Sequence, residues 1–176
     1  MSKSDNPLTT SGRIGTFIRT FTVPNLEREK VRLPTSTVVM TTQREPYRDA
    51  LFSVKQKITG DVANPLVEGG QKLIPSVTRT FNAGRELHVF LQAYERDSTA
   101  VRPLVGFVTL FKDGARVFET EPAGFDAWDP KIRAVPVRIT IPAGQLQPGT
   151  YDCQVTVLDP SGGKAAFWRA DVVIVK

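Results

Sequence analysis

Hydrophobic and polar positions alternate over short distances along most of the chain. From residue 73 onward, runs of β-branched and aromatic residues are separated by clusters of Gly, Pro, Asp and Asn. Each run has the length of a strand and each cluster has the composition of a turn, a pattern typical of all-β proteins. Residues 46–58 come closest to a helical period, and they fit a helical turn or an irregular linker equally well.

We predict seven strands, which cover residues 73–81, 86–95, 103–111, 115–121, 134–141, 150–158 and 165–175. The predicted fold class is therefore all-β. Because so many short strands follow one another with tight turns, they predict an immunoglobulin-like antiparallel β-sandwich. An N-terminal arm rich in strand-forming residues precedes this sandwich.

The only cysteine of the chain, Cys153, lies in a run that alternates strictly between apolar and polar residues. Its face of the strand is shared with Tyr151, Val155 and Val157. A free cysteine is among the most buried residue types, whereas a reactive one needs a nearby base or positive charge. The only histidine, His88, lies in a different predicted strand, so we interpret Cys153 as a core residue.

Three predicted turns have recognisable sequence signals. Asp113-Gly114 favours a type I′ hairpin, because both residues adopt positive φ readily. Residues 159–163 (DPSGG) close a longer hairpin. Pro148-Gly149 precedes Tyr151, an order that matches the tyrosine corner of immunoglobulin-like domains, where the tyrosine hydroxyl bonds to the backbone.

The N-terminal third contains two further strand-like runs, residues 13–23 and 31–42. The seven-strand sandwich needs neither of them, and unpaired strands recruit partners. Three outcomes stay open: the runs extend the sandwich within the chain, they are the remnant of a preceding domain, or they pair with another molecule by strand addition. The residues of the first run that we predict to contact a partner are Ile14, Phe17, Ile18, Phe21 and Val23.

Charge divides the chain near residue 57. Residues 1–57 hold ten Lys and Arg against five Asp and Glu, and the rest of the chain holds thirteen of each sign, so the net charge of +5 belongs to the first part. The basic residues are scattered singly, which is typical of a solvated face, and no nucleic-acid partner is predicted. We assign residues 1–57 to a basic arm, 58–72 to a linker and 73–176 to the sandwich.

Residue types that carry chemistry are sparse. One histidine and one cysteine leave almost no room for an ordinary zinc or copper site, and no glycine loop has phosphate-binding spacing. Asp126 and Asp129 share a loop, but two carboxylates are too few for calcium. We predict no enzyme activity, no metal and no cofactor. Phe125 and Trp128 in the same loop either pack over the end of the sandwich or form a platform for a sugar or a partner protein.

Three segments of the chain suggest a family: NPLVEGGQKLIPSVTRTF (64–81), PLVGFVTLFKDGARVFETEP (103–122) and AVPVRITIPAGQLQPGTYDCQVTVLDPSGGKAAFWRADVVIV (134–175). Together they resemble the C-terminal β-sandwich region of the acidobacterial von Willebrand factor A-related proteins. SGRIGTFIRTFTVPNL (11–26) is similar to the closing strand and exit linker of the domain that precedes this region in the family. The resemblance implies an extracellular or envelope-associated parent protein, although the first thirteen residues lack the apolar stretch of a secretory signal.

These observations favour a non-enzymatic interaction or structural module of a secreted or cell-envelope protein, whose partner is another protein. The alternative is a self-assembling extracellular fibre or oligomer subunit, in which residues 11–23 complete the sheet of a neighbouring copy. A ligand-binding module built on the loop 124–130 and a cytoplasmic enzyme are weaker alternatives. No apolar run approaches the length of a membrane-spanning helix, so no membrane insertion is predicted.

Overall fold

The computed structural model describes residues 31–47, 64–94, 102–142 and 144–176, and their regular structure is entirely β. This confirms the predicted all-β class. The strands of the described residues are β1 (Val39–Thr41), β2 (Arg44–Pro46), β3 (Val67–Glu68), β4 (Gln71–Leu73), β5 (Thr80–Asn82), β6 (Leu87–Tyr94), β7 (Leu104–Lys112), β8 (Ala115–Glu119), β9 (Ala123–Phe125), β10 (Ala134–Ile141), β11 (Gly149–Asp159) and β12 (Lys164–Val175).

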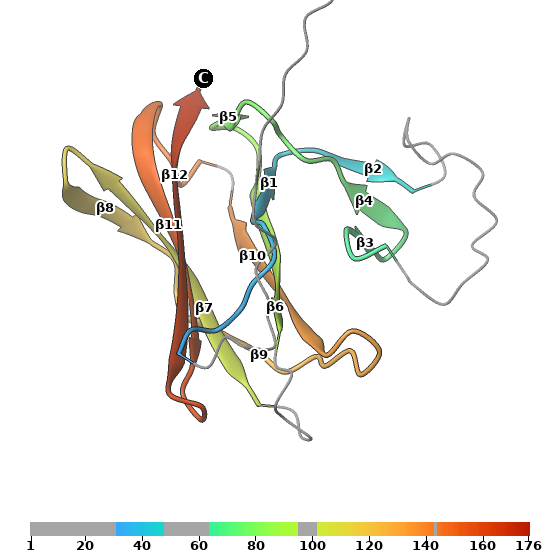
Figure 1. Ribbon diagram of the computed structural model, residues 1–176. Helices are drawn as coiled ribbons and strands as arrows, with labels where there is room; N and C mark the ends of the chain where they lie inside the picture. Colours follow the sequence, from blue (N-terminus) through green and yellow to red (C-terminus); the bar gives the residue numbers. More distant parts are fainter. Residues whose placement is uncertain (1–30, 48–63, 95–101, 143) are drawn as a thin grey trace, which may run out of the picture.

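Two sheets face each other across a shared core (Figure 1). The first sheet has the order β1-β6-β10, and the second has the order β5-β12-β11-β7-β8, with β9 also paired to β7. Neighbouring strands are antiparallel except β5, which runs parallel to the end of β12. Alternate residues of both sheets point into the space between them, so one hydrophobic core holds the two layers together.

The core follows the strand period that the sequence shows. Along β11, Cys153, Val155 and Val157 are almost completely buried, while the residues between them face the opposite side of the sheet. This confirms the interpretation of Cys153 as a core residue.

The hairpin and corner predictions are also confirmed. Asp113 and Gly114 have φ values of 52° and 78°, as a type I′ turn requires. The buried Tyr151 donates its hydroxyl hydrogen bond to the Gln147 carbonyl oxygen at 2.8 Å. This bond attaches the loop before β11 to the first residues of that strand, as in a tyrosine corner.

The prediction of a single strand over residues 73–81 is wrong. β4 ends at Leu73, β5 begins at Thr80, and the two strands belong to different sheets. Pro75 has no N–H for a ladder hydrogen bond, and Arg79 adopts a positive φ of 53°. The chain therefore turns between two strands that the sequence pattern merges into one.

Residues 33–41 join the sandwich within the same chain. The Leu33 N–H donates to the Ala165 carbonyl of β12 at 3.2 Å, and the Ser36 N–H donates to the Gln92 carbonyl of β6 at 2.8 Å. β1 then pairs along β6. The run 31–42 therefore crosses from one sheet to the other, and only its last residues form a strand. The run 13–23 lies outside the described residues.

A third, small sheet with the order β2-β4-β3 lies outside the sandwich, beside β6 and β10 (Figure 1). Residues 64–72, which the sequence analysis assigns to a linker, contribute β3 and most of β4 to it. This small sheet covers part of a face that would otherwise meet solvent.

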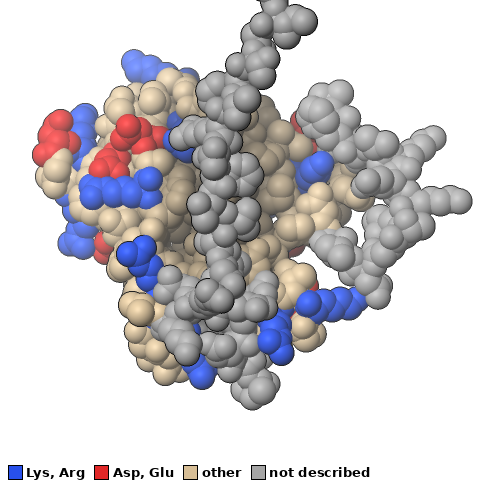
Figure 2. All heavy atoms as spheres, in the orientation of Figure 1, with Lys and Arg blue, Asp and Glu red and all other residues tan. Residues whose placement is uncertain are grey.

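Charged side chains of both signs are interspersed over the described surface in Figure 2, with no large patch of one sign on this face. Most of the basic N-terminal arm lies outside the described residues. The described residues contain no helix of sufficient length and apolarity to cross a membrane.

Candidate interaction surfaces

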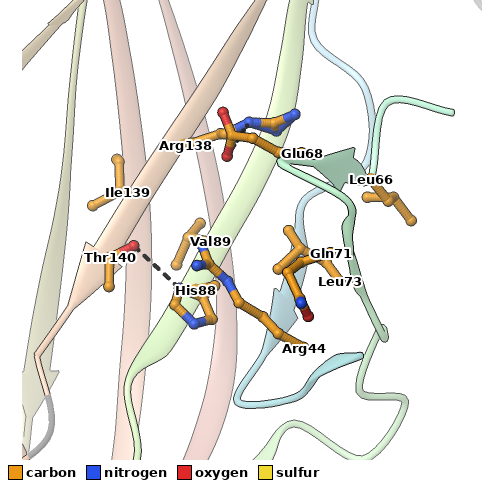
Figure 3. A pocket seen from close by; sticks show the side chains of 10 residues that line it. All are labelled: Arg44, Leu66, Glu68, Gln71, Leu73, His88, Val89, Arg138, Ile139 and Thr140. Carbon is orange, nitrogen blue, oxygen red and sulfur yellow. Dashed lines mark hydrogen bonds and ion pairs between the residues drawn. The ribbon is translucent and has the colours of Figure 1, made fainter. Parts of the chain in front are cut away.

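The small sheet and the outer face of β6 and β10 enclose a narrow polar pocket. Figure 3 shows Arg44 of β2 reaching toward His88 of β6, and Glu68 of β3 meeting Arg138 of β10. The pocket has a volume of about 20 Å³, which is enough for a water molecule and too small for a substrate.

His88 is a buried side chain in the wall of this pocket. Its Nδ1 lies 3.1 Å from the Thr140 Oγ1, and its Nε2 lies 3.7 Å from a carboxylate oxygen of Glu86. Burial lowers the pKa of His88, the positive charge of Arg44 lowers it further, and Glu86 opposes them by raising it. The lowered pKa favours the neutral ring, which suits a side chain that is only 5% exposed.

Arg138 attaches the small sheet to the sandwich. Its Nη2 donates to the Pro65 carbonyl at 2.9 Å, its Nε lies 3.2 Å from a carboxylate oxygen of Glu68, and its guanidinium lies 4.7 Å from the centre of the Phe90 ring. Its Nη1 is buried and has no hydrogen-bond partner among the described residues. Because one side chain contacts β6 and the segment leading into β3, Arg138 fixes the cover over Phe90.

A wider groove continues from Arg138 along the same outer face. It has a volume of about 530 Å³, and its lining includes Pro65, Val67, Gln92, Ile132 and Pro136. Asp129 and Lys131 add two charged side chains to this lining, beside Arg138. The groove therefore combines apolar contact with charged groups at one end.

Phe125 and Trp128, predicted as partner-contacting residues, are half-buried and pack against the core of the sandwich. Asp129 in the same loop accepts a hydrogen bond from the Lys131 N–H at 2.9 Å, while Asp126 is exposed. No group of three or more metal-binding side chains occurs in the described part of the chain. This loop therefore closes the end of the sandwich, as the packing interpretation expects, and leaves part of each ring accessible.

The other predicted contact residues, Ile14, Phe17, Ile18, Phe21 and Val23, all lie outside the described residues. Cys153 lies inside the core, where burial, followed by the charge of Asp152, raises the pKa of its thiol to about 12. A thiol with such a pKa stays protonated and is a poor nucleophile near neutral pH.

The outer face of the second sheet has no covering layer in the described structure. At the end near the β11–β12 hairpin, Val105 and Leu158 are cross-strand neighbours, and Phe107, Thr156 and Phe167 form the next row. The Phe167 side chain is 67% exposed. An aromatic side chain this exposed on a sheet face, with apolar neighbours, is the kind of surface that protein partners cover.

The other half of this bare face is charged. Arg169 donates to an Asp152 carboxylate oxygen at 2.8 Å, and its guanidinium lies 5.2 Å from the centre of the Phe111 ring. The hydrogen bond to Asp152 raises the pKa of Arg169, which is charged in any case. The face therefore combines an apolar end and a charged end along the same strands.

The free edge of β12 is the second exposed feature. β12 pairs with β11 along almost its entire length, but on its other side only its ends are bonded. The Ala165 carbonyl accepts from Leu33, and the Val173 N–H donates to the Arg79 carbonyl at 2.9 Å. Backbone groups alternate along a strand, so the N–H and C=O of Phe167, Arg169 and Asp171 face this edge. Among the described residues nothing bonds to them there.

Sequence reasoning missed both the β12 edge and the pocket around His88. The outward residues His88 and Gln92 of β6 are polar and give no sign of burial, and residues 58–72 have the composition of a linker. In the run 165–175, Phe167 shares one face of the strand with the charged residues Arg169 and Asp171. An aromatic residue on this otherwise polar face is the signal in the sequence for an exposed contact residue.

No protein-family model matches the chain, and no curated protein matches its sequence.

Proposed function

We propose that this chain is a non-enzymatic interaction or structural module that contacts another protein through β12 and the bare face beside it. The observation that carries the proposal is the edge of β12 between Ala165 and Val173, along which no strand of the described residues pairs, with the exposed Phe167 next to it. An unpaired edge offers backbone hydrogen bonds to an extended segment, and adjacent side chains supply specificity.

The sandwich is immunoglobulin-like in this proposal. The strand order of the two sheets, the parallel pairing of β5 with the last strand and the Tyr151–Gln147 corner support that assignment. Domains of this architecture serve many unrelated functions, so the argument rests on the exposed surfaces and not on the fold.

We place the module in a secreted or cell-envelope protein. The support is the resemblance of residues 64–81, 103–122 and 134–175 to the sandwich region of the von Willebrand factor A-related proteins. Fractionation of the native cells, with an antibody against the purified chain, tests this location. Recovery in the envelope or the medium is expected, and recovery only in the cytosol contradicts it.

A second function is favoured by the same edge together with the strand-like run 11–23. In it, each copy donates that run to the sheet of the next copy, which builds a fibre or oligomer. A donor segment and an acceptor edge would then both lie in one chain.

Light scattering over a concentration series, with negative-stain images of the same samples, separates the two functions. A constant monomer mass is expected for a module that awaits a different partner. A mass that rises with concentration, or visible fibres, contradicts the first function and supports the self-assembling subunit.

A further inference from the structure

We propose that the edge of β12 that faces away from β11 receives a short extended segment of a different protein, which places a lysine or arginine opposite Asp171 and an apolar residue opposite Phe167. The inference rests on the proposed function, because it names the chemistry of the partner that this edge binds. The length of the edge, its charge and its half-exposed inner side each limit what the partner can be.

The edge is closed at both ends by the chain itself. The Leu33 N–H donates to the Ala165 carbonyl at 3.2 Å, and the Val173 N–H donates to the Arg79 carbonyl at 2.9 Å. Residues 166–172 lie between these bonds, a length of roughly 23 Å at about 3.3 Å per residue. An added strand therefore has at most about seven paired residues and turns away from β12 at each end.

The β12 edge of a second copy does not meet this requirement. In an antiparallel pairing of two such edges centred on Arg169, Ala165 of each copy would lie opposite Val173 of the other. Leu33 and Arg79 already occupy those places. The pairing would also set the two Arg169 side chains opposite each other, and like charges in that position destabilise a pair of strands. A short segment of a different protein avoids both conflicts.

Asp171 supplies the charge that a partner would match. It is the cross-strand neighbour of Asp152 on the outer face, so two carboxylates lie side by side. Arg169 is engaged with Asp152, to which its Nε donates at 2.8 Å. The Asp171 carboxylate is exposed and forms no hydrogen bond or ion pair with any described residue. A cationic side chain opposite Asp171 would offset the repulsion between the two carboxylates.

The remaining outer positions of the edge are apolar or already paired. Phe167 lies four residues before Asp171 on the same face, and its side chain is 67% exposed. An apolar residue opposite Phe167 would bury part of this ring. Arg169 lies between them and is bound to Asp152, so an uncharged residue of the partner fits opposite it.

Side chains on the inner side of the edge call for an apolar cover. Trp168 packs against the core but remains half-exposed, with the Arg79 guanidinium 5.7 Å from the centre of its ring. Ala166 and Ala170 beside it are also only half-buried. β-branched residues on the inner face of the added strand would extend the core over them. In an antiparallel strand, the partner therefore reads basic, apolar, uncharged, apolar, apolar.

A synthetic peptide with this pattern tests the charge match. The probe is acetyl-Gly-Lys-Val-Thr-Val-Phe-Gly-amide, titrated into the full isotope-labelled chain and followed by the amide NMR signals of Phe167, Arg169 and Asp171. Its matched control carries glutamate in place of lysine. We expect the control peptide to bind at least about fivefold more weakly, because a like-charge pair replaces a pair of opposite charges.

Reversing the charge on the protein should reverse this preference. Asp171→Lys should bind the glutamate peptide at least about fivefold more tightly than the lysine peptide. Asp126→Lys is the matched control, since Asp126 is also exposed, lies in the loop between β9 and β10, and undergoes the same change of charge. Loss of the preference in both variants would show that net charge alone attracts the peptide, and would overturn the inference.

N-methylation of the peptide tests whether it binds as a strand. The N–H of its threonine would donate to the Arg169 carbonyl, and the N–H of the following valine would point away from β12. Methylating the threonine nitrogen should weaken binding at least about tenfold, and methylating that of the valine less than about twofold. Equal effects of the two methyl groups would overturn strand addition.

Amide hydrogen exchange of the full chain without peptide separates failure of this inference from failure of the proposed function. We expect fast exchange of the edge-facing N–H groups of Phe167, Arg169 and Asp171. The internal control is the set of N–H groups that face β11, those of Trp168, Ala170 and Val172. Protection of both sets would mean that the chain or a second copy already fills the edge, which overturns the inference and the proposed function together. Fast exchange without binding of the lysine peptide overturns the inference alone and leaves the edge to a partner of other chemistry.

Discussion

Each sheet of the sandwich has an outer face on which an arginine lies over a phenylalanine, but among the described residues only the first of the two faces has a covering layer. On the first sheet, Arg138 lies over Phe90 and pairs with Glu68, and the small sheet buries Phe90 to 3% exposure. On the second sheet, Arg169 lies over Phe111 and pairs with Asp152, in contact with solvent. The difference teaches that the contribution of a stacked Arg–Phe pair to the free energy of unfolding depends on whether other residues cover it. Burial strengthens both the apolar and the electrostatic contacts of the pair.

The largest contrast is expected between the aromatic residues of the two faces. Phe90→Ala should reduce the free energy of unfolding by about 3 kcal/mol, because it empties a buried site. Phe167→Ala should change it by less than about 0.5 kcal/mol, since its ring is already exposed. Urea unfolding followed by tryptophan fluorescence measures both values.

The milder Phe90→Leu keeps this comparison available if Phe90→Ala fails to fold. Equal losses for Phe90→Leu and Phe167→Leu would show that the second face is also covered in solution, and would break the contrast between the two faces.

Substitution of the two arginines should also cost more free energy of unfolding on the covered face than on the other, but the difference should be smaller than for the two phenylalanines. Arg138→Met keeps the stem over Phe90 and removes the bonds to Glu68 and Pro65, which should cost about 1–2 kcal/mol in this partly buried position. Arg169→Met should leave the urea midpoint unchanged, because its ion pair is exposed to solvent. Hydrogen exchange at Val67 and Leu73 should accelerate only in Arg138→Met. Acceleration in both variants would indicate that the small sheet does not depend on Arg138.

His88 should make the covered face sensitive to pH. Its pKa in the folded protein is lowered, so the unfolded chain binds more protons between that pKa and the ordinary value of 6.5. The free energy of unfolding should therefore be constant above about pH 6.5 and fall as the pH drops below it. Urea unfolding at a series of pH values measures the slope, and His88→Gln should remove the part of it that begins near pH 6.5. An unchanged slope in this variant would show that carboxyl groups cause it.

The smallest expected effect concerns Cys153, whose side chain points from β11 into the core, behind the outer face of the second sheet. Burial and the raised pKa should keep its thiol from reacting with iodoacetamide at pH 8 unless the protein unfolds. Phe167→Ala should leave the labelling rate unchanged, as measured by mass spectrometry. Faster labelling in this variant would reveal that the bare sheet opens locally.

The sequence predicts the sandwich well where each strand has one covered and one solvated face. The runs at 103–111, 134–141, 150–158 and 165–175 match β7, β10, β11 and β12 to within a few residues. In these runs one face of the strand is buried in the core, and this burial causes the alternation of apolar and polar residues. Such alternation is the strongest signal of a strand in a sequence.

The sequence does not predict the small sheet β2-β4-β3, because its strands are too short to show alternation of apolar and polar residues. β2, β3 and β4 contain two or three residues each, and their pairing depends on bonds to β10 through Arg138. His88 therefore looks like a solvent-facing residue of β6 in the sequence, although it is buried. The β12 edge was equally hidden, because a strand's composition does not say which of its sides finds a neighbour.

The bond between Leu33 and Ala165 has a mechanical consequence. It places the N-terminal side of the described chain at the start of β12, while Lys176 lies directly after the end of that strand. A pull between Val31 and Lys176 would be carried along β12 by its covalent backbone, and at the N-terminal side it would fall first on the Leu33–Ala165 and Ser36–Gln92 hydrogen bonds. The described N-terminal segment would therefore detach before the ladder between β11 and β12 opens.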